Sequence, residues 1–379
     1  MRNWMAVLSL ALVVAASALM TADRTTAQQG GATSGSLLTG GLLSPRGMKF
    51  GPDGMLYVAE AGIGGDTQFT GADGTVSNNG FTGRISRIDP ATGDRETVID
   101  GLPSNGTPTG DAVGAADVAF LDGELYYLQT HGGEGYGFPD TPTGIYRIED
   151  DGTTTLVADI GQFNIENPVE AITSGVQPDV EVGGNPYSMA VRDGAFWVVD
   201  GNHNRLMRVQ TDGTVEEITE FPDHPVSTGI ATQSSGPLYV SYLGPFPFAP
   251  EDGRVVSVGV PSGNITQVAS GVSSLTDVEF GPGGQLYALS FGAPATSPDA
   301  PAPWEFGTGT ILRVESNGTL TPLVTGLTFS TGLIFSGNTA FVTSGGITIP
   351  GVLDGEIWRI DDFTSIQPLT QEPAPAPQP

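Results

Sequence analysis

Apolar and polar residues alternate over most of this chain in short runs that are separated by glycine-centred turns. The first copy of this pattern has an apolar run at residues 45–50, the turn Gly51-Pro52-Asp53-Gly54 and a second run at residues 55–59. Alternation with a period of two around such turns predicts antiparallel β-hairpins. The same unit recurs five more times, at residues 116–128, 187–199, 228–240, 276–289 and 332–342.

A second hairpin follows each of these units and has a turn of its own. Residues 85–88 precede Thr92-Gly93, for example, and residues 145–148 precede Asp151-Gly152. Four strands per unit, repeated six times, predict an all-β fold, a six-bladed β-propeller of four-stranded antiparallel blades. Outside the N-terminal segment, no stretch keeps a helical period.

Two terminal segments compete to close the ring. Residues 36–42 are similar to the outer strand at residues 322–327, so an N-terminal strand could complete the last blade and remove an exposed edge. Residues 365–369 could take the same place. The sequence does not decide between them.

The two ends of the chain differ from the repeats. Arg2 precedes an apolar run from Met5 to Met20, and Ala27 offers a cleavage site. Residues 1–27 are therefore expected to be a signal peptide, 28–35 a disordered N-terminus, 36–370 the propeller and 371–379 a Pro-rich disordered tail. An uncleaved membrane anchor is the alternative, but the apolar run is shorter than the roughly 20 residues of a spanning helix. We expect an exported protein, periplasmic or extracellular, with no membrane insertion after cleavage.

Charge narrows the classes of partner. The chain has 42 acidic and 14 basic residues, a net charge of -28, which disfavours binding to nucleic acid or anionic lipid. It has no cysteine, so disulfides and thiolate metal sites are excluded. No phosphate-binding loop, nucleophile elbow or zinc-protease motif occurs, and we expect no nucleotide or haem cofactor.

Several segments carry a resemblance to known propellers. Asn185-Pro186-Tyr187, followed by residues 198–206, resembles an NHL-type repeat. Residues 239–248, together with residues 101–104 and 275–278, resemble the ScyD/ScyE family of exported β-propellers, and the resemblance spans residues 36–361. It implies export and a propeller, but no biochemical role. The sequence departs from the family pattern at Gly184, where serine is usual, and at His203, where a small residue is expected.

One mouth of the central channel is the expected site of binding. In a propeller, the start of each innermost strand and the end of each second strand meet at the same face, and in this chain long aromatic-bearing loops follow the second strands. The expected ligand-face residues are Arg46, Tyr187, Tyr242, Phe246 and Phe248. Alternatively, the aromatic side chains only pack the loops onto the ring.

Acidic and amide residues at the same strand ends suggest a divalent metal. The candidate ligands are Glu60, Asp117, Asn185, Asp200 and Asp277. Their oxygen atoms suit Ca²⁺, as in calcium-dependent lactonases of six-bladed form, a comparison at the level of the fold alone. The alternative is that each aspartate binds backbone amides at a strand end.

Two residues are candidates for acid–base chemistry. His131 follows a second strand near Asp117, and either His131 or Asp200 could serve as a base. A loop histidine without catalytic role is the alternative for His131. His203 and His224 are interpreted as structural or solvated, and no Schiff-base role is expected for Lys49.

These observations lead to two main functional hypotheses. The first is an exported binding or accessory protein that recognises a small molecule, a glycan or a protein partner on its loop-rich face. The second is a divalent-metal-dependent hydrolase or lactonase at the channel mouth. A quinone-dependent sugar dehydrogenase ranks last, because only Arg46 and His131 are near the channel. The first hypothesis is placed ahead of the second.

Overall fold

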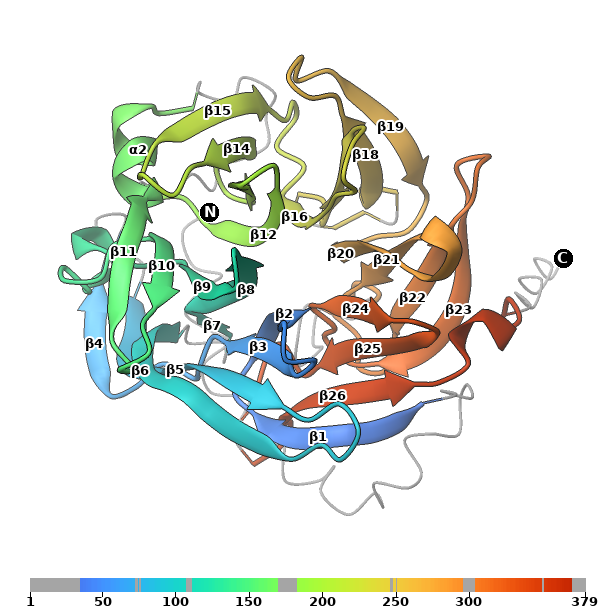
Figure 1. The fold of residues 1–379 in the computed structure, drawn as a ribbon, viewed down its shortest axis with the longest axis horizontal. Coiled ribbons are helices and arrows are strands. Elements are labelled where there is room, and N and C mark those ends of the chain that lie inside the picture. The colour runs from blue at the N-terminus through green and yellow to red at the C-terminus, as the bar shows by residue number, and fades with distance from the viewer. Residues whose placement is uncertain are drawn as a thin grey trace, which may run out of the picture.

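The computed structural model describes residues 35–71, 74, 76–106, 111–169, 183–245, 248–249, 251–295, 304–349 and 351–369. The described strands form six antiparallel sheets arranged radially about one axis (Figure 1). This confirms the predicted six-bladed β-propeller. The predicted signal peptide, most of the predicted disordered N-terminus and the predicted Pro-rich tail lie outside the described residues. No helix within the described part is long and apolar enough to cross a membrane.

The two inner strands of each blade match the predicted hairpins. From the first blade to the sixth they are β2 (Pro45–Phe50) and β3 (Leu56–Glu60), β8 (Ala115–Leu121) and β9 (Glu124–Gln129), β12 (Pro186–Arg192) and β13 (Ala195–Asp200), β16 (Ser227–Ala231) and β17 (Leu238–Tyr242), β20 (Leu275–Phe280) and β21 (Leu286–Ser290), and β24 (Leu333–Ser336) and β25 (Thr339–Ser344).

The outer strands complete the blades in the same order. They are β5 (Val76–Ile88) and β6 (Arg95–Gly106), β10 (Gly144–Ile148) and β11 (Thr154–Asp159), β14 (Arg205–Val209) and β15 (Val215–Glu220), β18 (Arg254–Val258) and β19 (Ile265–Ser270), β22 (Gly309–Val314) and β23 (Leu320–Leu327), and finally β26 (Gly355–Ile360) with β1 (Ser36–Leu42). The first blade also carries two short strands, β4 (Thr67–Thr70), which pairs with β5, and β7 (Ala112–Val113), which pairs with β6.

The N-terminal strand closes the ring. β1 pairs with β26 in antiparallel register from Ser36 opposite Arg359 to Leu42 opposite Gly355 (Figure 1). The competing C-terminal segment lies elsewhere, since the Leu369 N–H donates to Pro322 O of β23 in the fifth blade at 2.9 Å. The last blade is thus built from both ends of the propeller, which protects its outer edge.

Apolar side chains fill the spaces between neighbouring blades. Tyr126 of the second blade, for example, meets Phe196 of the third edge to face, with ring centroids 4.8 Å apart. Near the axis the inner strands pack so closely that glycine is needed. A Cβ atom on Gly47 would lie 2.0 Å from Asp117 Oδ1, and one on Gly229 would lie 2.5 Å from Asp277 Oδ1.

One short helix departs from the all-strand expectation. Helix α2 (Ile160–Glu166) follows β11, and the Asp159 carboxylate caps it by accepting from the Gln162 N–H at 2.7 Å. A seven-residue helix contains only two turns, too few for a helical period to stand out in the sequence. Its buried Asn164 reaches the neighbouring blade, as described below.

Candidate functional site: a pocket at the channel mouth

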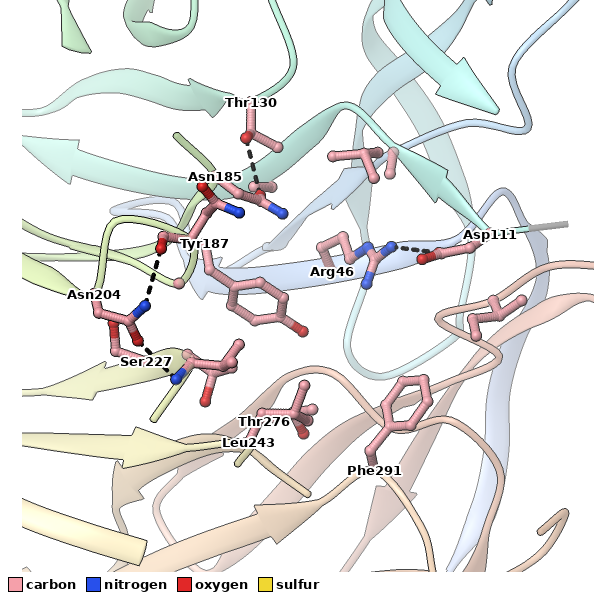
Figure 2. Close-up of a pocket in the computed structure, with 18 of the residues that line it drawn as sticks. Arg46, Asp111, Thr130, Asn185, Tyr187, Asn204, Ser227, Leu243, Thr276 and Phe291 are labelled. Carbon is pink, nitrogen blue, oxygen red and sulfur yellow. Dashed lines mark hydrogen bonds and ion pairs between the residues drawn. The ribbon is translucent and has the colours of Figure 1, made fainter. Parts of the chain in front are cut away.

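The strand ends at the predicted face enclose a cavity of about 610 Å³. All six blades contribute to its lining, and Figure 2 shows many of these side chains. The described lining residues are Arg46, Ala61, Asp111, Val113, Gly114, Ala115, Ala116, Thr130, Asn185, Tyr187, Gly201, Asn202, Asn204, His224, Val226, Ser227, Thr228, Leu243, Pro245, Phe248, Thr276, Phe291, Trp304 and Ile347. A cavity of this size accommodates a small organic molecule.

An ion pair stands on one side of the pocket. Arg46, near the start of β2, donates from Nη2 to Asp111 Oδ1 at 3.0 Å and to Ala112 O at 2.7 Å. Its guanidinium group also interacts electrostatically with the hydroxyl of Tyr187. Burial lowers the pKa of Arg46, but Asp111 and Tyr187 outweigh it and the net shift is upward, so Arg46 is charged.

Tyr187 points into the pocket from β12. Burial raises the pKa of its hydroxyl, although the Arg46 charge opposes this, so Tyr187 is neutral at ordinary pH. Asn185, two residues earlier, accepts at Oδ1 from Thr130 Oγ1 at 3.0 Å. Figure 2 shows the Tyr187 hydroxyl, the Arg46 guanidinium and the Asn185 amide around the same space.

A histidine completes the polar side. Asn204 Oδ1 accepts from the Val226 N–H at 2.7 Å, and Asn204 Nδ2 lies 3.2 Å from His224 Nδ1. Because this arrangement makes Asn204 Nδ2 the donor, His224 Nδ1 is the acceptor. Burial lowers the pKa of His224 despite the opposing charges of Glu220 and Asp223, which favours the neutral ring that this hydrogen bond requires.

Aromatic rings form another part of the wall. Trp304 packs against Phe291 at 4.8 Å and against Phe248 at 4.7 Å between ring centroids. Trp304 Nε1 donates to Ser274 Oγ at 2.9 Å, which fixes the orientation of the indole ring. The pocket therefore combines a hydrogen-bonding side with a flat apolar side.

Further along the inner strands, the channel holds four ionisable side chains. Lys49 Nζ of β2 lies 3.8 Å from Glu279 Oε2 of β20. Lys49 also interacts electrostatically with Asp117 of β8 and Asp277 of β20. Burial lowers the pKa of Lys49, but the three carboxyl groups outweigh it, and the net shift is upward. Burial raises the pKa of Asp277 to about 8 against the opposing charge of Lys49.

Both channel aspartates also connect neighbouring blades. Asp117 Oδ2 accepts from Ser188 Oγ and from the Met189 N–H, each at 2.8 Å, and Asp277 Oδ2 accepts from the Leu333 N–H at 2.7 Å. These bonds join the second blade to the third and the fifth to the sixth. Burial raises the pKa of Asp117 as well, while Lys49 opposes the shift.

The five predicted metal ligands do not form one site. Glu60 is fully buried and accepts from Arg84 Nη2 and the Leu43 N–H, each at 2.7 Å, and also from Ser86 Oγ. Within the described residues, no three acidic or histidine side chains are grouped so that they could hold a metal ion. The prediction of convergence at the mouth was wrong because the position of a strand end does not fix the direction of its side chain.

Asp200 illustrates this reason. Its buried carboxylate accepts from the backbone N–H groups of Asn185, Asn202 and His203 at 2.9–3.0 Å and from Asn164 Nδ2 at 2.8 Å. The alternative interpretation, an aspartate that binds backbone amides at a strand end, describes Asp200 correctly. The Asp200 carboxylate fixes the backbone at two lining residues, Asn185 and Asn202, but Asp200 does not line the cavity itself.

His131 is also absent from the lining. Its ring is 7% exposed and stacks on Tyr136, with centroids 4.3 Å apart. Tyr242 is buried against Phe221, with ring centroids 5.4 Å apart, and does not line the cavity. Phe246 lies outside the described residues. Of the predicted site residues, Arg46, Asn185, Tyr187 and Phe248 line the pocket.

Several lining residues could not be identified from the repeats. Asp111 lies in a connection between blades, outside the repeat pattern, and His224 was interpreted as structural because it stands between turn residues. Trp304 belongs to one of the long aromatic-bearing loops expected at this face, and Phe291 directly follows a second strand whose position was predicted. The order of strands and loops within each repeat therefore predicts where a lining residue stands, but not its role.

Comparisons with known proteins find similarity in structure only. No protein-family model and no curated protein matches the sequence. Similar solved structures include the PQQ-bound aldose sugar dehydrogenase of Streptomyces coelicolor, with a TM-score of 0.52 and 13% identity over 87% of this chain and 99% of that one. A candidate gluconolactonase has a TM-score of 0.50 and 13% identity over 89% and 94% of the two chains. A luciferin-regenerating enzyme has a TM-score of 0.50 and 10% identity over 84% and 92%. At these identities the comparisons show that the chain shares their β-propeller fold.

Proposed function

We propose that this propeller is an exported binding protein that holds a small organic molecule in the pocket at its channel mouth. The observation that carries the proposal is the cavity of about 610 Å³, with the Arg46, Asn185 and Tyr187 side chains on one side and the rings of Phe291 and Trp304 on another. Small-molecule sites typically combine apolar walls with a few oriented polar groups. The apolar segment at residues 5–20 supports export, so the ligand would be met outside the cytoplasm.

A screen of small organic fragments by ligand-observed NMR tests this proposal. We expect a set of fragments to bind the wild-type protein and to lose binding in Trp304→Ala, because the substitution removes an apolar wall of the pocket. Phe81→Ala is the matched control, since Phe81 is 64% exposed and does not line the cavity. If no fragment binds, or if Trp304→Ala binds as the wild type does, the proposal fails.

Hydrolysis of a lactone in the same pocket is the second candidate function. The shared fold with the candidate gluconolactonase supports it, and so does the presence of the Asp111 carboxylate at the cavity. The described residues do not bring together a set that fits calcium, so we derive no step through a metal. Turnover of glucono-1,5-lactone, measured by acid release with and without CaCl₂ and lost in Asp111→Asn, would replace binding by catalysis as the function.

A further inference from the structure

The hydrogen bonds around the pocket fix which of its polar groups can donate to a ligand. The first is Asn185. Its Oδ1 accepts from Thr130 Oγ1 at 3.0 Å, which leaves the two hydrogens of its Nδ2 for the cavity. In Figure 2 the Asn185 amide nitrogen lies on the cavity side. Asn185 therefore presents a donor.

Tyr187 is oriented in the same sense. The positive Arg46 guanidinium interacts electrostatically with the Tyr187 hydroxyl, which favours the orientation in which the oxygen faces Arg46 and the proton points away from it. The hydroxyl proton then remains available to a ligand, and the raised pKa of Tyr187, caused by burial, keeps that proton in place. Tyr187 is a second donor.

His224 is the third. Its Nδ1 accepts from Asn204 Nδ2, so in the neutral ring the proton is on Nε2. The carboxylate among the lining residues, Asp111, is already paired with Arg46 at 3.0 Å. The polar side of the pocket thus offers three N–H or O–H donors beside an ion pair that neutralises itself.

A donor-rich wall calls for acceptor atoms on the ligand. Carbonyl-type oxygens accept two hydrogen bonds without carrying a charge, whereas an anion would approach a protein of net charge -28 against repulsion. The rings of Phe248, Phe291 and Trp304 favour a flat apolar body next to that oxygen.

We propose that the pocket is specific for neutral, flat ring compounds that carry a carbonyl-type oxygen, such as lactones, cyclic ketones and aryl esters. The oxygen accepts from Tyr187 Oη and Asn185 Nδ2, and the ring lies against the Trp304 wall. This inference rests on the proposed function and adds the ligand class to it.

Three related compounds test the ligand class. Coumarin has a flat ring and a lactone carbonyl, 2H-chromene lacks the carbonyl, and coumarin-3-carboxylate adds a negative charge. Each is titrated by saturation-transfer NMR into the wild type, Tyr187→Phe and Tyr57→Phe. The last variant is the matched control, because Tyr57 loses the same hydroxyl away from the cavity, beside the turn between β2 and β3, where it bonds to Asp53.

We expect coumarin to bind the wild type and to bind Tyr187→Phe about two- to tenfold more weakly, the effect of one lost hydrogen bond. Chromene should bind more weakly than coumarin and equally to all three proteins, and the anion should bind more weakly than coumarin. Equal binding of chromene and coumarin, or no effect of Tyr187→Phe, would overturn the inference and leave the binding function standing. If coumarin-3-carboxylate binds more tightly than coumarin, the inference that the pocket prefers neutral ligands is overturned. If none of the compounds binds and the fragment screen is also empty, both proposals fall.

Discussion

The channel carboxyl group of Asp277 should make the propeller less stable as pH rises. Its pKa in the folded chain is about 8, against an ordinary value of 3.8, and burial is the main cause. The sign follows from linkage. A raised folded pKa means that the stabilising contribution is complete below pH 3.8 and is lost as pH increases through about 8. In Asp277→Asn the amide oxygen can still accept from the Leu333 N–H, and the Val278 N–H, which donates to Oδ1 at 2.8 Å, loses its acceptor at every pH. The asparagine side chain does not ionise, so the variant lacks the dependence on pH.

The size of the effect follows from the shift. A difference between 3.8 and about 8 corresponds to a ceiling of about 6 kcal/mol of unfolding free energy between acid and pH 9. The neighbouring side chains of Lys49 and Glu279 are 24% and 19% exposed, so water enters the channel and reduces this figure. We expect the stability of Asp277→Asn relative to the wild type to rise by about 2 kcal/mol or more between pH 4 and pH 8, whereas the lost Val278 hydrogen bond lowers it by the same amount at both.

Urea unfolding at pH 4, 6 and 8 measures this difference. Subtracting the unfolding free energy of the wild type from that of the variant cancels the contributions of carboxylates that both proteins share. One of these is Asp53, whose pKa is lowered because its backbone and side-chain hydrogen bonds outweigh burial. Suppose that the stability of Asp277→Asn relative to the wild type does not rise between pH 4 and pH 8. Asp277 would then be ionised and held by Lys49, and the inference that burial keeps Asp277 protonated in the channel would be refuted.

Two further predictions concern buried polar groups outside the cavity lining. Arg84→Ala should destabilise the protein by about 3–5 kcal/mol, because it leaves the fully buried Glu60 without its cation. In contrast, Arg87→Ala should cost less than about 1 kcal/mol, since its partners Asp53 and Glu96 are largely solvated. Equal effects in urea unfolding would contradict this. Asn164→Ala should cost about 1–3 kcal/mol, because Asp200 and Gly183 O lose a buried donor, whereas Asn167→Ala, at the exposed end of the helix, should change stability by less than about 0.5 kcal/mol. Thermal unfolding of the two asparagine variants checks the ranking, and an unaffected Asn164→Ala would remove the structural role assigned to the helix.

The propeller could be predicted from sequence because each hairpin repeats the same alternation and the same type of turn. The positions of Arg46, Asn185 and Tyr187 within their repeats also predicted that they lie at the channel mouth, where all three line the pocket. Closure by β1 was one of two open possibilities, and it is decided by pairing with β26, a contact between residues more than 300 positions apart in the chain.

The chemistry of the site was harder to predict, because it depends on where each side chain turns. Glu60 and Asp200 stand at the expected strand ends, yet their carboxylates face Arg84 and backbone amides. Asp111 and His224 lie in connections that the repeat does not describe. The sequence indicated no catalytic role for Lys49, and its contribution, a positive charge among three channel carboxyl groups, required the packing of separate blades.

The occupancy of the mouth pocket is the most direct test of the central claim. Crystals of the protein soaked with the fragments that bind in solution would show their positions at atomic detail. We predict density inside the cavity, with an acceptor oxygen near Tyr187 and Asn185 and a ring against Trp304. Fragments that leave this cavity empty and gather elsewhere on the surface would contradict the assignment of the channel mouth as the binding site.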